Sequence, residues 1–408
     1  METVVSLDGA TAAHGGKAAA LGALRRTGLP VPAGFVVPAG VPDHDLPAAV
    51  AAGLDDLAGP GAERAAVAVR SSATDEDGPR ASAAGQYETV LGVVGPRAVA
   101  AAVVACRASA TSVRATAYRG ATAGTRTGTA AGEGEISAVE VAVLVQRLVD
   151  ARAAGVLFTD GGHTVVEGSW GLGESVVRGA VDPDRWTVDG GGLRDRRPGS
   201  KRTRVDRSPG GTAVRDVPAS HRDRLCLDDA TVLRVAALGD RAAALLGGPQ
   251  DVEWAVDDDG AVWLLQARPV TAPLPAGCGR AFGPVPGRIK GQMPAHSDRE
   301  AVVRGVGASG GRATGPARVV RGPEVFGTVR AGDVLVCRET DPAWTPLFGV
   351  VSAVVTETGG LLSHAAIVAR ELRLPAVLGV PGATDVLRDG GTLAVDGDVG
   401  TVTAHPAR

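Results

Sequence analysis

The segment from 350 to 371 constrains the fold of this chain most, because it places one histidine between a buried strand and a helix. Residues 350–355 form an apolar run typical of a buried strand, and an apolar helical run follows a Gly-Gly pair. Ser363 is of a residue type that caps helices, which puts His364 in the first helical turn. Backbone N–H groups and the helix dipole favour phosphate there, and neutral imidazole is a nucleophile near pH 7. The segment predicts a phosphohistidine site; the alternative is a histidine that only caps a helix.

Two basic side chains in the N-terminal part of the chain are candidates for phosphate contacts. Gly15-Gly16-Lys17 opens a helical run, where backbone N–H groups and an ammonium can hold phosphate. Arg70 follows the apolar strand predicted at 65–69 and precedes a hydroxyl-rich turn, where a guanidinium can clamp phosphate oxygens. The alternatives are a loop with a solvated lysine and an arginine in a surface ion pair.

A β-hairpin is predicted over residues 251–270, with its turn at Asp258-Asp259. A symmetric hairpin places Glu253 opposite Leu264, so that Glu253, Gln266 and Arg268 share one face. Carboxylate and amide oxygens are ligands that suit Mg²⁺, and a nearby arginine offsets phosphate charge. The pattern favours a metal site, and the alternative is a solvent-facing polar surface.

Further motifs extend these observations to a family resemblance. Residues 359–371, with 340–347 before them and 374–379 after them, resemble the swivelling phosphohistidine domain of the phosphoenolpyruvate-utilising dikinases. This family includes pyruvate phosphate dikinase, phosphoenolpyruvate synthase and rifampin phosphotransferase. Seven segments resemble, in the family's order, its ATP-grasp nucleotide domain: 15–18, 69–74, 81–86, 145–149, 155–159, 171–174 and 265–271.

The resemblance implies a role for each matching residue. His364 is expected to carry the phosphoryl group, while Glu253 and Gln266 are expected to hold Mg²⁺. The residues implied in ATP binding are Lys17, Arg70 and Arg268 at the phosphates, Ser82 and Gly85 in the loop over them, and Gln146 and Leu148 near adenine, the last two largely through backbone groups.

The resemblance also implies a multidomain α/β and α+β fold. We expect an ATP-grasp domain at 1–271, a linker rich in proline and glycine at 272–304, and a swivelling phosphohistidine α/β domain at 305–408. Two features depart from the family. Leu362 stands where pyruvate phosphate dikinases have a regulatory threonine, and only the linker occupies the place of the large acceptor domain.

Composition limits the partners. The chain has 408 residues and a net charge of −3, and no apolar run approaches the about 18 residues of a membrane helix. With no basic excess and no secretory signal at the start, we expect a cytoplasmic protein without nucleic-acid or membrane partners.

These features predict an ATP-dependent dikinase-type phosphotransferase. The β-phosphoryl group of ATP is expected to pass to His364, giving AMP and phosphate, and then to a small-molecule acceptor. One alternative is a subunit of a split enzyme whose acceptor domain is a separate protein. Others are a non-catalytic ATP-binding or phosphocarrier protein, and a compact enzyme whose small substrate binds between the domains.

Overall fold

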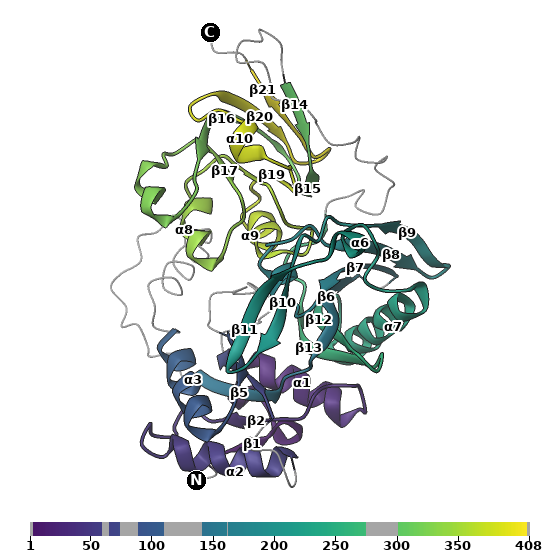
Figure 1. The fold of residues 1–408 in the computed structure, drawn as a ribbon, viewed down its shortest axis with the longest axis vertical. Helices are drawn as coiled ribbons and strands as arrows, with labels where there is room; N and C mark the ends of the chain where they lie inside the picture. Colours follow the sequence, from purple (N-terminus) through teal and green to yellow (C-terminus); the bar gives the residue numbers. More distant parts are fainter. Residues whose placement is uncertain are drawn as a thin grey trace.

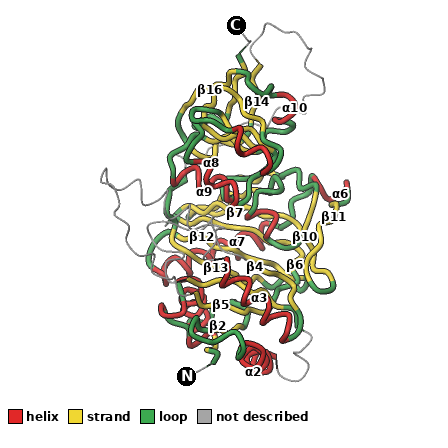
Figure 2. The backbone as a smooth tube through the Cα atoms, turned by 90° about the vertical axis from the view of Figure 1, so that its left-hand side faces the viewer, coloured by secondary structure: helices red, strands yellow, loops and turns green. Residues whose placement is uncertain are grey.

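A computed structural model describes residues 3–58, 65–73, 89–109, 141–160, 162–274 and 301–405. The chain runs from one end of the molecule to the other, with the two termini at opposite ends (Figure 1). Three sheets of five or more strands follow one another along this direction among the described residues. The helix α9 (His364–Glu371) lies at the junction between the middle and the C-terminal sheet in both views (Figures 1 and 2).

The first sheet has the antiparallel order β1-β2-β5-β3-β4. Its strands are β1 (Val5–Ser6), β2 (Gly34–Val37), β3 (Val67–Ala73), β4 (Thr89–Val93) and β5 (Val141–Arg147), and its helices are α1 (Gly16–Arg26), α2 (Leu46–Ala58) and α3 (Pro96–Ser109). Side chains alternate along β5: Val143 and Val145 join the core with α2 and α3, while Ala142 and Leu144 join the core with α1. Helices therefore cover both faces of this sheet.

The middle sheet has the antiparallel order β13-β12-β6-β7-β8-β9. Its strands are β6 (Ala151–Thr159), β7 (His163–Trp170), β8 (Asp184–Asp189), β9 (Gly192–Arg197), β12 (Gln250–Asp257) and β13 (Val262–Pro269). The helix α7 (Asp229–Leu246) packs on it, between an Asp228 side chain that caps Thr231 N–H and a left-handed Gly247 at φ 82°. The remaining elements are α5 (Glu174–Val177), α6 (Ala219–Arg222) and the hairpin of β10 (Thr203–Ser208) and β11 (Gly211–Asp216).

The C-terminal sheet has the order β14-β21-β20-β16-β17-β18-β19-β15. Its strands are β14 (Ala301–Arg304), β15 (Val306–Ser309), β16 (Arg312–Val319), β17 (Val334–Cys337), β18 (Ala353–Thr356), β19 (Ala376–Leu378), β20 (Thr392–Asp396) and β21 (Thr401–Ala404), with helices α8 (Thr345–Phe348), α9 and α10 (Ala383–Val386). The strands β16 to β19 are parallel, and β17, β18 and β19 are buried throughout. Continuous apolar strands of this kind are typical of parallel sheets covered on both faces.

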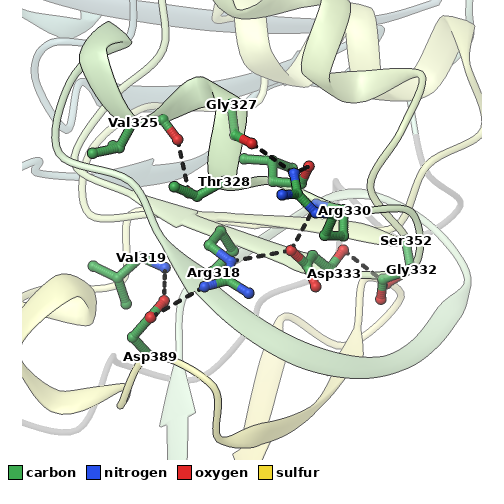
Figure 3. Close-up of polar contacts among 11 residues, drawn as sticks. Arg318, Val319, Val325, Gly327, Thr328, Arg330, Gly332, Asp333, Ser352 and Asp389 are labelled. Carbon is green, nitrogen blue, oxygen red and sulfur yellow. Dashed lines mark hydrogen bonds and ion pairs between the residues drawn. The ribbon is translucent and has the colours of Figure 1, made fainter.

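Polar contacts secure the start of β17. The buried carboxylate of Asp333 accepts hydrogen bonds from Arg318 Nε at 3.1 Å and from the backbone of Arg330 at 2.9 Å (Figure 3). Asp389 contacts the same Arg318 at 3.3 Å and accepts from the backbone of Val319 at 2.8 Å. The end of β16 and the start of β17 are therefore fixed by charged side chains.

Three features of the fold differ from the sequence predictions. The buried strand predicted at 350–355 is β18 at Ala353–Thr356, and Val350 is exposed. The strand β3 does not stop at 69 but continues through Ala73, because Ser71 and Ser72 are buried and pair with Val143 and Ala142 of β5. Residues 301–304, assigned to the linker, form β14 and pair with β21. The sequence analysis missed this strand because four residues are too few to show the alternation of apolar and polar side chains. They also directly follow a segment rich in proline and glycine.

The middle and C-terminal sheets share an apolar core. The buried side chains Val156, Phe158 and Val165 of the middle sheet lie in one cluster with Leu361, Leu362 and Ile367 around the start of α9. No helix in the described part of the chain is long and apolar enough to cross a membrane.

Candidate active site

A cavity of about 350 Å³ lies where α1, β3, β5, β12, β13 and α9 meet. The residues that the sequence predicted for the site and that line this cavity are Lys17, Arg70, Gln146, Leu148, Glu253, Gln266, Arg268 and His364. The structure thus brings together every predicted site residue within its described ranges. Ser82 and Gly85 lie outside the described residues.

The Gly-Gly-Lys motif anchors the first turn of α1 on β3. Gly15 has φ +87°, and a Cβ atom there would lie 2.1 Å from the carbonyl oxygen of Ser72. The Ser72 hydroxyl accepts from Ala18 N–H at 3.1 Å, and Lys17 Nζ donates to the carbonyl of Ser71 at 3.0 Å. Lys17 is only 5% exposed, and this hydrogen bond to Ser71 holds its ammonium at the cavity.

Arg70 lies in the middle of β3 rather than at a strand end. Its guanidinium donates to Leu265 O at 2.9 Å and to Glu253 Oε2 at 2.7 Å, with Gln266 Oε1 at 3.5 Å. Arg70 thereby joins the first sheet to the hairpin of the middle sheet. A guanidinium held by three acceptors in this way is fixed in orientation before any ligand arrives.

The hairpin register differs from the prediction, although the predicted face is correct. Near the turn, Leu264 pairs with Trp254 and not with Glu253, a slip of one residue. A register shift follows between Glu253 and Trp254, which leaves Leu265 as an extra residue on β13, so that Glu253 pairs directly with Gln266. The bulge returns Glu253, Gln266 and Arg268 to the same face of the hairpin. The carbonyl of Leu265 accepts a hydrogen bond from Arg70.

Asp251 is a member of this face that sequence reasoning missed. It pairs with Arg268 across the hairpin, and its Oδ2 accepts from Arg268 Nε at 2.7 Å. Its place two residues before Glu253 on the same strand was the available signal, because side chains alternate along a strand. The pair orients the guanidinium of Arg268 beside Glu253 and Gln266.

The pKa values of Asp251 and Glu253 shift in opposite directions. Burial raises the pKa of Asp251, and the ion pair with Arg268 only partly opposes it. Burial would also raise the pKa of Glu253, but Arg70, followed by Arg268 and Lys17, lowers it below its ordinary value. Glu253 is therefore an ionised oxygen donor at neutral pH, which is the form that a metal ion requires.

These donors fit a magnesium ion that arrives with a nucleotide. Glu253 and Gln266 present a carboxylate and an amide oxygen from directly paired positions. Within the described ranges, no three acidic, histidine or cysteine side chains are grouped to hold a metal by themselves. Mg²⁺ commonly takes one or two protein oxygens and completes its shell with phosphate oxygens and water, so the pair suffices.

His364 is the first residue of α9, as predicted, and its side chain is buried. The predicted cap is only positional: Ser363 occupies the N-cap, but its hydroxyl donates to Gly360 O at 2.9 Å and does not bind the helix N–H groups. The imidazole Nε2 lies 3.4 Å from Thr345 Oγ1. Asp341 also lines the cavity; sequence reasoning included it in a family motif without giving it a role.

The residues predicted near adenine use their N–H groups inside the protein. Gln146 Nε2 donates to Pro32 O at 3.2 Å, and the backbone N–H of Leu148 donates to Ala66 O at 3.0 Å. A ligand contact at Leu148 therefore has to use its carbonyl or its apolar side chain. The cavity wall beside it includes Leu91, Ala154 and Leu172, which suits a flat, largely apolar ring.

Comparison with known proteins gives two family matches. Residues 41–274 match the pyruvate phosphate dikinase AMP/ATP-binding domain, and residues 329–400 match the mobile domain of PEP-utilising enzymes. A probable phosphoenolpyruvate synthase of Methanothermobacter thermautotrophicus is 34% identical over 95% of this chain and 61% of its own length. The phosphoenolpyruvate synthases of Escherichia coli and Pseudomonas aeruginosa are 37% and 38% identical over 84% and 87% of this chain, each over 44% of its own length. The chain thus spans less than two thirds of each of these relatives.

Proposed function

The chain belongs to the family of pyruvate phosphate dikinase and phosphoenolpyruvate synthase, and from this premise we propose that it is an ATP-dependent phosphotransferase that phosphorylates its own His364. The family and the multidomain α/β and α+β fold predicted from the sequence are thereby confirmed. The observation that carries the proposal is the shared cavity. The first two sheets, within residues 3–274, form what we call the nucleotide unit, and the C-terminal sheet lies within residues 301–405. His364, from the C-terminal unit, lines the same cavity as the cations and oxygen donors of the nucleotide unit. A nucleotide in this cavity stands against a histidine.

The proposed reaction uses each of these groups. Lys17, Arg70 and Arg268 bind the phosphates of ATP and offset their charge, while Glu253 and Gln266 would hold Mg²⁺. Bound Mg²⁺ supplies further positive charge at the phosphate oxygens. A ring nitrogen of His364 attacks the β-phosphorus, and the bond from this phosphorus to the bridging oxygen of AMP breaks. This leaves a pyrophosphoryl group on the histidine. Water then attacks the γ-phosphorus and breaks its bond to the bridging oxygen, which releases phosphate and leaves phosphohistidine.

Burial supports this role for the histidine. His364 is 3% exposed, so the docked arrangement keeps water from competing with the imidazole as nucleophile. The hydroxyl of Thr345 contacts one ring nitrogen and orients the ring. Positioning of this kind accounts for much of the catalysis in phosphoryl transfer, where little covalent chemistry falls to the protein.

The phosphoryl group then passes to an acceptor, which we propose to be a small molecule. Because the chain spans at most 61% of the three relatives' lengths, a separate protein that carries the acceptor site is an alternative. Mass spectrometry of proteins that co-purify with the phosphorylated chain separates the two. We place the reaction in the cytoplasm, where its proposed donor ATP is available.

The test is incubation with Mg²⁺ and ATP labelled at the β-phosphorus. We expect an acid-labile, base-stable phosphoprotein that His364→Ala abolishes. His163→Ala is the matched control, because His163 begins β7 and does not line the cavity. Full labelling of the His364→Ala variant would refute the assignment.

A further inference from the structure

The carboxylate of Glu167 reaches from the middle sheet into the loop that precedes His364. Glu167 lies on β7 and is fully buried. Its Oε1 accepts from the backbone N–H of Leu361, and its Oε2 accepts from that of Leu362, each at 3.0 Å. One side chain of the nucleotide unit thus holds two successive peptide groups just before α9.

Arg185 completes this arrangement. It is the cross-strand partner of Glu167 on β8 and donates to Oε1 at 2.7 Å. The ion pair compensates for burying the carboxylate, which would otherwise be costly. Hydrogen bonds from N–H groups to an ionised carboxylate are about twice as strong as those between neutral groups. The contact is therefore an oriented one, in contrast to the apolar cluster around it.

The loop is shaped to accept this carboxylate. A Cβ atom on Gly360 would lie 2.2 Å from Glu167 Oε2, so any larger residue would push the loop away. Beside it, the hydroxyl of Thr358 donates to Gly179 O of the nucleotide unit at 2.7 Å. The side chains of Leu361 and Leu362 are 1% exposed in the shared core. The loop 358–362 thus has a built seat on the other unit.

We propose that Glu167 is a positioning residue for the phosphorylation of His364. Its carboxylate seats the loop 358–362 and so sets where the imidazole stands relative to the nucleotide. This inference rests on the proposed function. Glu167 does not line the cavity, so it acts on the transfer from ATP only through the loop, and nucleotide affinity does not depend on it.

Two variants test the contact between the Glu167 carboxylate and the loop 358–362, one on each of the two units. Glu167→Gln keeps the shape but replaces one acceptor oxygen by an NH₂ group, which faces a backbone N–H instead of accepting from it. Gly360→Ala places a methyl group against the Glu167 carboxylate from the other unit and keeps the charges of both Glu167 and Arg185. The control is Asp189→Asn, which breaks an ion pair with Arg194 at the far end of β8, away from the loop.

The first measurement is the single-turnover rate of phosphohistidine formation at saturating ATP. For Glu167→Gln and Gly360→Ala we expect this rate to fall by at least about tenfold, which corresponds to losing one hydrogen bond to a charged group. Nucleotide affinity should stay within about twofold of wild type, and Asp189→Asn should match wild type in both respects. Unchanged rates in both loop-seat variants would overturn the proposal.

The second measurement does not depend on catalysis. Amide hydrogen exchange reports whether the N–H groups of Leu361 and Leu362 are held. We expect faster exchange in the peptide 359–363 of Glu167→Gln, with exchange in β17 and β18 unchanged. If wild type forms no phosphohistidine, the proposed function fails and this exchange result alone decides the seat. Equal exchange in wild type and Glu167→Gln would refute the seat.

Discussion

Replacing Glu253 by glutamine removes one charge from the cavity and almost nothing else. The side chain keeps its length and its place opposite Gln266 on the hairpin. Arg70 loses its 2.7 Å ion pair with Glu253 but keeps its hydrogen bond to Leu265 O. The substitution therefore tests the charge of the proposed metal ligand and leaves the bulge that positions it.

The expected effect on stability is small. A hydrogen bond between charged groups contributes about 1.5–3 kcal/mol, and removing the burial of one charge offsets part of this loss. We expect a net destabilisation of about 1–2 kcal/mol, which lowers the melting temperature by a few degrees in a protein of this size. The effect on nucleotide binding in the presence of Mg²⁺ should be larger. We expect the affinity to fall by about 10- to 100-fold, because Glu253 is the only charged residue of the two proposed metal ligands.

The assay is calorimetric titration with ATP, in excess Mg²⁺ and in excess chelator, on Glu253→Gln and wild type. The informative quantity is the ratio of the two affinities, which cancels general damage to the cavity. Asp251→Asn is the matched control: it lies on the same face and pairs with Arg268, so it should weaken both affinities alike and leave the ratio unchanged. A wild-type ratio in Glu253→Gln would refute the assignment of the hairpin face as a metal site.

Three further predictions concern products, pH and a buried ion pair. With ATP but no acceptor, we expect at most about one AMP per protein; sustained ADP formation that Lys17→Ala abolishes and His364→Ala does not would place the histidine outside the reaction. Because the pKa of Glu253 is lowered in the folded state, its contribution to stability is present above the unfolded pKa of about 4.3 and is lost as the pH falls through the lower folded value. The difference in melting temperature between wild type and Glu253→Gln should therefore be constant from about pH 8 to 5 and shrink only in more acidic buffer; a difference that disappears near neutrality would contradict this. Lys201 and Asp184 form a fully buried ion pair at 2.5 Å, so Lys201→Met should destabilise the fold by about 3–5 kcal/mol in chemical denaturation, and a loss below about 1 kcal/mol would show that Asp184 is neutral there.

The sequence predicted the local structure around His364 correctly, because one local pattern decides that geometry. His364 begins a helix after a strand, a glycine turn and a residue in the N-cap position, which stand in order before it, although the Ser363 hydroxyl makes no capping hydrogen bond. The hairpin was predicted less well. A symmetric turn gives the wrong partner for Glu253, and no sequence signal marked Leu265 as the bulged residue. The correct face survived because the slip and the bulge each shift the register by one residue.

Contacts between distant segments lie beyond such patterns. Glu167 appeared in the sequence only as a carboxylate in an apolar strand, and its partners are backbone N–H groups 194 and 195 residues further along the chain. Every residue except proline has a backbone N–H group, so the residue types at 361 and 362 do not indicate this contact. The same applies to Arg70, whose strand was predicted to end too early because Ser71 and Ser72 look like turn residues. Their burial against β5 decides the outcome, and burial is a property of the assembled sheets.

The charges around the cavity explain why its arginines can act without rearrangement. Arg70 is paired with Glu253 and Arg268 with Asp251, and Lys17 adds a further cation at the cavity. The carboxylates hold the two guanidinium groups at 2.7 Å. Among the described residues, five lysine and arginine side chains and three carboxylates line the cavity, and this excess of positive charge favours an anion. Under the proposed function, a nucleotide with Mg²⁺ would place positive charge beside Glu253, which would hold the metal and leave Arg70 to the phosphates. The arginine is oriented before binding and its charge becomes available on binding, which is how preorganised groups stabilise developing charge in a buried site.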